Sequence, residues 1–282
     1  MSRRLRLDAE LVRRGLARSR DQAADLIAAG RVAVAGQLAA KPASQVAVDA
    51  PITVQQASDG PDYVSRGGHK LAGALAVFAQ VGAEAVAGHA HLSGTRRLVV
   101  AGKRCLDAGA STGGFTDVLL RAGAAHVLAV DVGYGQLAWS LQTDDRVTVL
   151  DRVNVRNLTP EQVAPPPELV VADLSFISLA LVLPALAACA AGAADFLLMV
   201  KPQFEVGKEK AGSGVVRDPG LRAAAVASVA SAAAGVGLGV AGITASPLPG
   251  PSGNVEYFLW LHRGAGPLDD AALRQAIAAG PQ

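Results

Sequence analysis

The stretch Cys105-Leu106-Asp107-Ala108-Gly109-Ala110-Ser111-Thr112-Gly113-Gly114-Phe115 decides the fold of this chain. Apolar residues lead into a glycine-rich turn, and the turn leads into the start of a helix. This is the order of a strand, a ligand-binding loop and a helix. Glycines at such a turn allow the backbone to approach a nucleotide closely. The stretch therefore predicts a nucleotide-binding domain of the α/β class.

The pattern continues beyond this stretch, because apolar segments alternate with helical ones. Such alternation predicts a mostly parallel sheet with helices on both faces. The expected strands are 104–107, 126–130, 147–150, 168–172, 195–200, 239–245 and 255–262, and the main helices are 114–122, 178–190 and 218–234.

The connection between the last two strands is short and rich in proline and glycine, from Pro247 to Gly253. It is too short for a helical crossover, so the final strand should run antiparallel to its predecessor. A seven-stranded sheet whose last strand is reversed is typical of class I, Rossmann-like methyltransferases and not of dehydrogenases.

The residues around the glycine-rich turn favour one kind of cofactor. Asp131 ends the next strand, 22 residues after Gly109, where these folds place an acid that binds ribose. A dinucleotide site is the alternative, but its G-x-G-x-x-G pattern is absent. Asp107 also precedes the first glycine, which suits the ammonium group of a methionine-derived ligand; a turn without a ligand is the structural alternative. The predicted cofactor-binding residues are Asp107, Gly109, Ser111, Thr112, Gly113, Gly114, Phe115, Asp131, Asn154 and Asp173.

Charged residues stand at the ends of three apolar strands. Asp173 follows the fourth strand, Lys201 follows the fifth, and Glu256 lies inside the last. The carboxyl ends of parallel strands share one edge of a sheet, so these charges should face one crevice. For Asp173, a helix cap or an ion pair is the structural alternative. A lone buried glutamate is costly, and Lys201 is the natural cationic partner for Glu256.

The composition bounds the remaining possibilities. Half of the residues are hydrophobic (51%) and 18% are charged, so the chain can bury a sizeable core. Proline and glycine interrupt the two longest apolar segments, 174–200 and 223–255, which favours buried helix–turn–strand units over membrane spans. Cys105 and Cys189 are isolated from other potential ligands, which indicates neither a disulfide nor a metal site. We expect a cytoplasmic protein without a signal peptide, membrane or metal.

The amino-terminal region differs from the rest of the chain. Residues 1–31 contain eight arginines against four acids, an excess larger than the net charge of +2 of the whole chain. Such a concentration is typical of proteins that bind phosphate backbones, with a solvated helical surface as the alternative. The pattern predicts a small α+β unit with helices from Asp8 to Gly15 and from a capping box at Ser19 to Ala29, followed by strands at 31–34 and within 46–54. A helix from Leu71 to about Val81 follows the boundary near Asp59–Asp62.

These motifs resemble the TlyA-type rRNA 2'-O-methyltransferases, sometimes labelled haemolysin A, which join an S4-like RNA-binding domain to an FtsJ-like methyltransferase domain. The resemblance covers nearly the whole chain. It rests on the segments Asp8–Arg20, Ser65–Leu71, Gly109–Asp117, Asp173–Ser178 and Lys201–Glu205. It implies an S4-like domain at 1–60, a linker at 61–64, an FtsJ-like domain at 65–265 and a carboxyl-terminal tail at 266–282.

The resemblance also implies the chemistry. FtsJ-like enzymes share a Lys-Asp-Lys-Glu tetrad, which falls on Lys70, Asp173, Lys201 and Glu256. The cofactor would be S-adenosyl-L-methionine, and Lys201 in its neutral form would take the proton from a ribose 2'-hydroxyl; this chemistry requires no metal. The implied RNA-binding residues are Arg3, Arg4, Arg6, Arg13, Arg14, Arg18, Arg20 and Arg66.

The implied substrate is cytidine in ribosomal RNA. The full arginine-rich start resembles the longer members of the family, which act on both 16S and 23S rRNA in the 30S and 50S subunits. Longer members often carry an Arg-x-Trp-Val linker, where this chain has Pro61-Asp62-Tyr63-Val64. One alternative is an RNA-binding ribosome-assembly factor with a vestigial methyltransferase domain. Another is a membrane-lytic protein, which only the haemolysin label suggests.

Overall fold

The structure is a computed structural model that divides into two compact units, Met1–Val64 and Ser65–Gln282. The residues that it describes are 4–17, 19–28, 30–54, 62–79, 91–92, 97–207, 214–250 and 252–281.

In the smaller unit, the described residues form two helices and five short strands around one apolar core. Its helices are α1 (Leu7–Arg13) and α2 (Arg20–Ala28), and Ser19 Oγ accepts a hydrogen bond from the backbone of Gln22 at 3.1 Å. This bond is the Ser19 half of the expected capping box. The strands are β1 (Arg4–Arg6) paired with β4 (Gln45–Ala47), and β2 (Val32–Val34) paired with β3 (Gln37–Leu38) and β5 (Ile52–Val54), all antiparallel.

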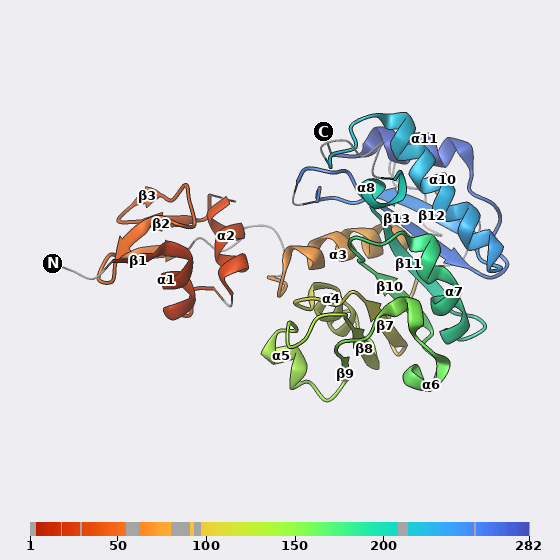
Figure 1. Cartoon of the computed structure of the whole chain (residues 1–282), viewed down its shortest axis with the longest axis horizontal. Helices are drawn as coiled ribbons and strands as arrows, with labels where there is room; N and C mark the ends of the chain where they lie inside the picture. Colours follow the sequence, from red (N-terminus) through yellow and green to blue (C-terminus); the bar gives the residue numbers. More distant parts are fainter. Residues whose placement is uncertain are drawn as a thin grey trace. The chain divides into compact units, whose positions relative to one another are not determined.

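The larger unit is built on one sheet with the strand order β6-β12-β13-β11-β10-β7-β8-β9; Figure 1 labels strands β7 to β13. The strands are β6 (His91–Leu92), β7 (Arg104–Ala108), β8 (His126–Val130), β9 (Val147–Leu150), β10 (Leu169–Ala172), β11 (Asp195–Val200), β12 (Gly239–Ala245) and β13 (Tyr257–His262). Strands β7 to β11 pair in parallel, whereas β13 pairs antiparallel with both β11 and β12. The seven strands β7–β13 confirm the expected sheet with its last strand reversed, and β6 adds a short edge.

Helices pack on both faces of this sheet. They are α3 (Arg66–Ala79), α4 (Gly114–Arg121), α5 (Trp139–Gln142), the 3-10 helix η1 (Val155–Asn157), α6 (Pro160–Val163), α7 (Leu179–Cys189), α8 (Pro202–Glu205), α10 (Pro219–Gly235) and α11 (Asp270–Ala279). Neighbouring residues of β13 show the two faces, as side chains alternate along a strand. The Trp260 ring lies 5.6 Å from that of Phe78 in α3, whereas Leu259 joins the core formed with α7 and α10.

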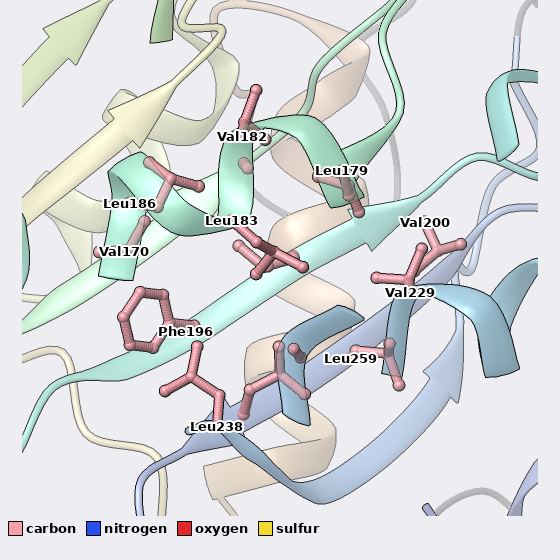
Figure 2. Packing of buried hydrophobic residues seen from close by; sticks show 14 of the residues in the cluster. Val170, Leu179, Val182, Leu183, Leu186, Phe196, Val200, Val229, Leu238 and Leu259 are labelled. Atoms are coloured by element: carbon pink, nitrogen blue, oxygen red, sulfur yellow. The ribbon is translucent and has the colours of Figure 1, made fainter. Parts of the chain in front are cut away.

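The main hydrophobic core fills the space between the sheet and the helices α7, α10 and α11. Figure 2 shows Leu183 and Leu186 of α7 packed over Phe196 of β11, with Val229 of α10 beside Val200. These segments are nearly continuous apolar runs, as expected for parallel strands that are covered on both faces.

The segment 266–282, which the sequence analysis names only as a carboxyl-terminal tail, contains a helix that packs on the main core. Residues Asp270–Ala279 form α11, and the Asp269 carboxylate accepts a hydrogen bond from the backbone of Ala272 at its start. Leu273 and Ile277 are four residues apart and belong to the main core. The other buried residues of this helix, Ala272 and Ala276, are small, so the apolar stripe is weak in the sequence, and packing on the main core is what stabilises the helix.

A buried acid at the start of β11 forms hydrogen bonds with a lysine and with a tryptophan of β13. Asp195 is 1% exposed, and its carboxylate accepts hydrogen bonds from Lys103 Nζ at 2.8 Å and from Trp260 Nε1 at 3.0 Å. The one charge within the long apolar segment 174–200 therefore has a structural role.

Replacing Asp195 with alanine should lower the free energy of unfolding by about 2–4 kcal/mol, because it leaves a buried indole N–H and a lysine without their acceptor. Denaturant unfolding followed by the fluorescence of the buried Trp260 measures this loss. The exposed Asp145→Ala variant is the control, and an equal effect of the two substitutions would contradict the prediction.

Candidate active site

The ends of β7 and β10 approach each other closely at Gly109. Its φ is +86°, and a Cβ at this position would lie 2.7 Å from the backbone oxygen of Asp173. The Asp173 backbone N–H in turn donates to the carbonyl of Ala108 at 3.0 Å. Only glycine combines this backbone conformation with such a close contact, so the glycine-rich turn and the loop after β10 form one wall.

A cavity of about 490 Å³ opens at this wall. Five of the ten predicted cofactor-binding residues line it: Gly109, Ser111, Asp131, Asn154 and Asp173. The sequence reasoning missed eight other lining residues, which are Val132, Gln136, Val155, Leu174, Ser175, Phe176, Ile177 and Val182.

The other residues of the turn form its support. A Cβ at Gly113 would clash with Leu141, and one at Gly114 would lie 2.8 Å from the backbone nitrogen of Gly68 in α3. The Thr112 carbonyl accepts a hydrogen bond from the backbone of Ala138, and Phe115 is a core residue that is 3% exposed. These residues shape the loop from behind the cavity.

Asp131 and Asn154 fix the loops on the opposite side of the cavity. The two carboxylate oxygens of Asp131 accept hydrogen bonds from the backbone of Ser111 at 2.8 Å and of Gly133 at 2.7 Å. Asn154 accepts from the backbone of Arg156 at 3.0 Å and caps η1. Both side chains therefore have a structural role in addition to lining the cavity.

Asp107 does not reach the surface of the cavity. It is fully buried, its Oδ2 accepts a hydrogen bond from Thr116 Oγ1 at 2.7 Å, and its Oδ1 has no hydrogen-bond partner among the described residues. Burial raises the pKa of the Asp107 carboxyl to about 7, although the hydrogen bond from Thr116 opposes this shift. A buried carboxylate oxygen without a donor fits a cationic ligand nearby.

The strand-end charges gather at the carboxyl edge of the sheet. Asp173 follows β10 and Lys201 follows β11. Glu256 precedes β13, and because β13 is antiparallel, its start lies at the same edge. The pairing of Val200 with Tyr257 places Lys201 and Glu256 opposite each other in the extended register.

Two ion pairs organise these charges. Lys201 Nζ lies 2.6 Å from Asp173 Oδ1 and donates a hydrogen bond to Ser175 Oγ at 2.9 Å. Lys70 Nζ lies 2.6 Å from Glu256 Oε2. The expectation that Lys201 is the partner of Glu256 is therefore wrong. The start of α3 lies against this edge, since a Cβ at Gly67 would be 3.7 Å from Asp173 Oδ2, and α3 delivers Lys70 to Glu256.

The loop after β10 carries an aromatic residue that the sequence analysis did not single out. Phe176 is 90% exposed with a φ of +63°, and its ring lies 5.1 Å from that of Phe204 in α8. Glu205 accepts hydrogen bonds from Ser178 Oγ at 2.5 Å and from the backbone of Leu179 at 2.9 Å. The loop is thereby fastened to the short helix that follows Lys201.

The comparisons with known proteins agree with this geometry. The model of the FtsJ-like methyltransferases matches residues 63–263, and that of the S4 domain matches residues 5–52. The chain is 57% identical, over the full length of both proteins, to the 16S/23S rRNA (cytidine-2'-O)-methyltransferase TlyA of Mycobacterium tuberculosis. The chain belongs to the TlyA family of FtsJ-like methyltransferases.

Other relatives of this TlyA-family chain carry a different label. It is 34% identical to Hemolysin A of Brachyspira hyodysenteriae, over 90% of this chain and 98% of the relative. A solved structure from Streptococcus thermophilus, assigned only provisionally as a hemolysin, has 35% identity and a TM-score of 0.73 over 99% of this chain and 96% of its own. Within the described residues, no helix is long and apolar enough to cross a membrane, and no group of three or more His, Cys, Asp or Glu could hold a metal.

Two buried acids pair with four of the predicted RNA-binding arginines in the S4-like unit of this TlyA-family chain. Asp8 accepts hydrogen bonds from Arg6 and Arg20, and Glu10 accepts them from Arg13 and Arg14. The bond from Arg6 holds the pKa of Asp8 well below its usual range, and the bond from Arg13 lowers that of Glu10 to about 2. These acids therefore remain charged and hold the guanidinium groups in fixed positions.

The predicted arginines differ in their other contacts. Besides its bond to Glu10, Arg14 donates hydrogen bonds to the carbonyls of Val48 and Ala50 at 2.7 Å each, so its guanidinium group stabilises the fold of the smaller unit. Arg4 is exposed, and Arg66 donates to the Pro249 carbonyl at 3.3 Å from the start of α3. Arg3 and Arg18 lie outside the described residues.

Replacing Glu256 with leucine should cost about 3–5 kcal/mol of stability, because Lys70 is then buried without a counter-charge. The double variant Lys70→Met/Glu256→Leu should recover most of this loss. Urea unfolding followed by circular dichroism measures both variants.

The control is the surface pair of Arg146 and Asp144, with a distance of 2.7 Å and side chains that are 48% and 24% exposed. Removing it with Arg146→Ala should cost less than about 1 kcal/mol. A double variant as unstable as Glu256→Leu would contradict the assignment of a buried ion pair.

Proposed function

We propose that this chain transfers the methyl group of S-adenosyl-L-methionine to the ribose 2'-hydroxyl of cytidine in ribosomal RNA. The observation that carries the proposal is the lysine at the rim of the cavity. Lys201 is held by Asp173 and Ser175, which both line the cavity where a methyl donor would bind. The name of the mycobacterial TlyA relative supports cytidine in rRNA as the substrate.

The residues of the cavity fit the cofactor. Asp131 lines the cavity and would bind ribose hydroxyls. Oδ1 of Asp107, which has no hydrogen-bond partner among the described residues, would neutralise a ligand's ammonium group from behind the turn. The turn at Gly109 leaves room for close backbone approach. When bound, S-adenosylmethionine supplies a methyl group on a positively charged sulfur, which an oxygen nucleophile can take.

Lys201 acts as the general base in this proposal. In its neutral form, Nζ accepts the proton of the 2'-hydroxyl while the ribose oxygen bonds to the methyl carbon. The carbon–sulfur bond breaks and its electron pair stays on sulfur, so the products are a 2'-O-methyl ribose and a neutral thioether. Lys201 is left as an ammonium group, which Asp173 stabilises until it loses the proton to solvent. Much of the rate should come from positioning, because the reaction is a simple in-line transfer.

Lys70 and Glu256 complete the proposed tetrad. Both are nearly fully buried, so their charges act in a medium that screens them little. Glu256 stands opposite Lys201 in the register of β11 and β13, and its bond to Lys70 keeps a second cation at the same edge. We assign to this pair the positioning of the ribose and of Lys201.

The domain organisation follows from the same proposal. Residues 1–60 form the S4-like RNA-binding domain, 61–64 the linker and 65–265 the methyltransferase domain, to which α11 adds a helix. The paired arginines of the first domain and Arg66 would contact the RNA backbone. The target nucleotide must leave its stack, at a cost of about a few kcal/mol. Both 16S and 23S rRNA in the 30S and 50S subunits are the proposed targets, and the ribosome places this activity in the cytoplasm.

Replacing Lys201 with arginine should lower methyl transfer by at least about 1000-fold, because a guanidinium keeps the charge but cannot become neutral to accept a proton. Binding of S-adenosylmethionine, measured by calorimetry, should change little. Transfer of radiolabelled methyl groups to separate 30S and 50S subunits, followed by mapping of the modified ribose, provides the readout.

The exposed Lys41→Arg substitution is a matched control that should retain full activity in transfer to the 50S subunit. Full activity of Lys201→Arg would exclude Lys201 as the base. Cofactor binding by the unaltered protein without methyl transfer to either subunit would overturn the proposed function.

Binding of S-adenosylmethionine should weaken as the pH falls below about 7. The protonated form of Asp107 prevails below its pKa of about 7, and a cationic ligand then has to displace that proton. Each lower pH unit should weaken binding by up to about tenfold. Calorimetry between pH 5.5 and pH 7 should show that the affinity of Asp107→Asn for S-adenosylmethionine does not change with pH. The control Asp145→Asn should keep the pH dependence of the unaltered protein. A pH dependence that persists in Asp107→Asn would contradict the prediction.

A further inference from the structure

We infer that Ser175 is the positioning residue of the proposed base, because its hydroxyl fixes the direction in which Lys201 presents its lone pair. The inference rests on the proposed function and concerns a residue outside the tetrad. Ser175 Oγ accepts a hydrogen bond from Lys201 Nζ at 2.9 Å, and Ser175 lines the cavity together with Asp173.

The contacts around Nζ support this role. A neutral lysine amine has two N–H bonds and one lone pair. Within the described part of the chain, Nζ forms an ion pair with Asp173 Oδ1 at 2.6 Å, without hydrogen-bond geometry, and donates a hydrogen bond to Ser175 Oγ at 2.9 Å. The ion pair holds the position of Nζ, and the hydrogen bond to Ser175 fixes the direction of one N–H bond, which restricts the directions that the lone pair can take.

A single contact would not achieve this. Lysine has a flexible stem, and one hydrogen bond allows the amine to rotate about the bond axis. In that case the lone pair would point to the substrate for only part of the time. The hydrogen bond to Ser175 and the ion pair with Asp173 together restrict this rotation, which is a gain of the kind that accurate positioning gives to enzymes.

The structure holds Ser175 and Lys201 in place together. Lys201 is the residue that precedes α8, and Glu205 at the end of α8 binds Ser178 and the start of α7 on the other side of the loop. Between these points, the Phe176 ring packs on Phe204 of α8. The loop that carries Ser175 is thus attached by several contacts to the helix that follows the base, so the loss of a single one of them leaves Oγ close to Nζ.

The test compares Ser175→Ala with Ser175→Thr in methyl transfer to the ribosomal subunit that the unaltered protein modifies. Ser175→Ala should lower kcat by about 10- to 100-fold, with KM for the subunit and the affinity for S-adenosylmethionine unchanged within about threefold. Ser175→Thr keeps the hydroxyl and should restore kcat to within about fivefold of the unaltered protein.

Ser178→Ala is the matched control. It removes a hydroxyl contact from the same loop without touching Lys201, so it should lower the melting temperature and leave kcat within about threefold. This comparison separates loosening of the loop from loss of the contact to the base.

Three results would overturn the inference. Full kcat in Ser175→Ala would show that the contact has no role, and a parallel loss of cofactor affinity would make Ser175 a cofactor ligand. Failure of Ser175→Thr to restore activity would assign the effect to packing. Each result is compared with the activity of the unaltered protein and with the lost activity of Lys201→Arg. An inactive unaltered protein would instead contradict the proposed function itself.

Discussion

The close approach of the backbone after β7 to the backbone after β10 determines where every group of the site can stand. At Gly109 there is no room for a side chain, since a Cβ would lie 2.7 Å from the carbonyl oxygen of Asp173. This contact makes the glycine-rich turn and the loop Asp173–Ser178 two halves of one wall. The cavity, the carboxylate of Asp173 and the hydroxyl of Ser175 therefore share a single rigid support, and Lys201 is bound to that support through both side chains.

The second constraint is electrostatic. Four charges are placed at one edge of an apolar sheet, and each nearly buried lysine is matched by a carboxylate at 2.6 Å. Isolated charges there would cost several kcal/mol each, so the pairing is a condition of folding as well as of the proposed chemistry. The two pairs differ in their exposure: Glu256 is 1% exposed, whereas the side chain of Asp173 is 23% exposed. The more open pair is the one beside the cavity.

The sequence predicts the sheet and its edge well, because apolar runs that end in a charge are a local signal. It does not reveal which charges pair. Lys70 and Glu256 are far apart in the chain, and their contact depends on the packing of α3, which no local pattern encodes.

Asp107 illustrates a second limit, since the sequence places an acid beside the turn but does not reveal how deeply that acid is buried below the cavity. Phe176 illustrates a third limit, since its ring contacts Phe204 of α8, which is distant in the sequence. The pairing of Glu10 with Arg13 and Arg14 is different: their spacing of three and four residues on a helix is a readable signal.

The acids beneath the arginines have a consequence for the proposed binding of RNA. Counterions condense around a nucleic acid backbone and are released when a protein's cations replace them, with a logarithmic salt slope of about −0.7 to −0.9 per neutralised phosphate. Asp8 and Glu10 already neutralise part of the positive charge of four guanidinium groups. In the proposed complex, the S4-like unit would therefore release fewer ions than its arginine count suggests, and the proposed binding of RNA would be correspondingly less sensitive to the salt concentration.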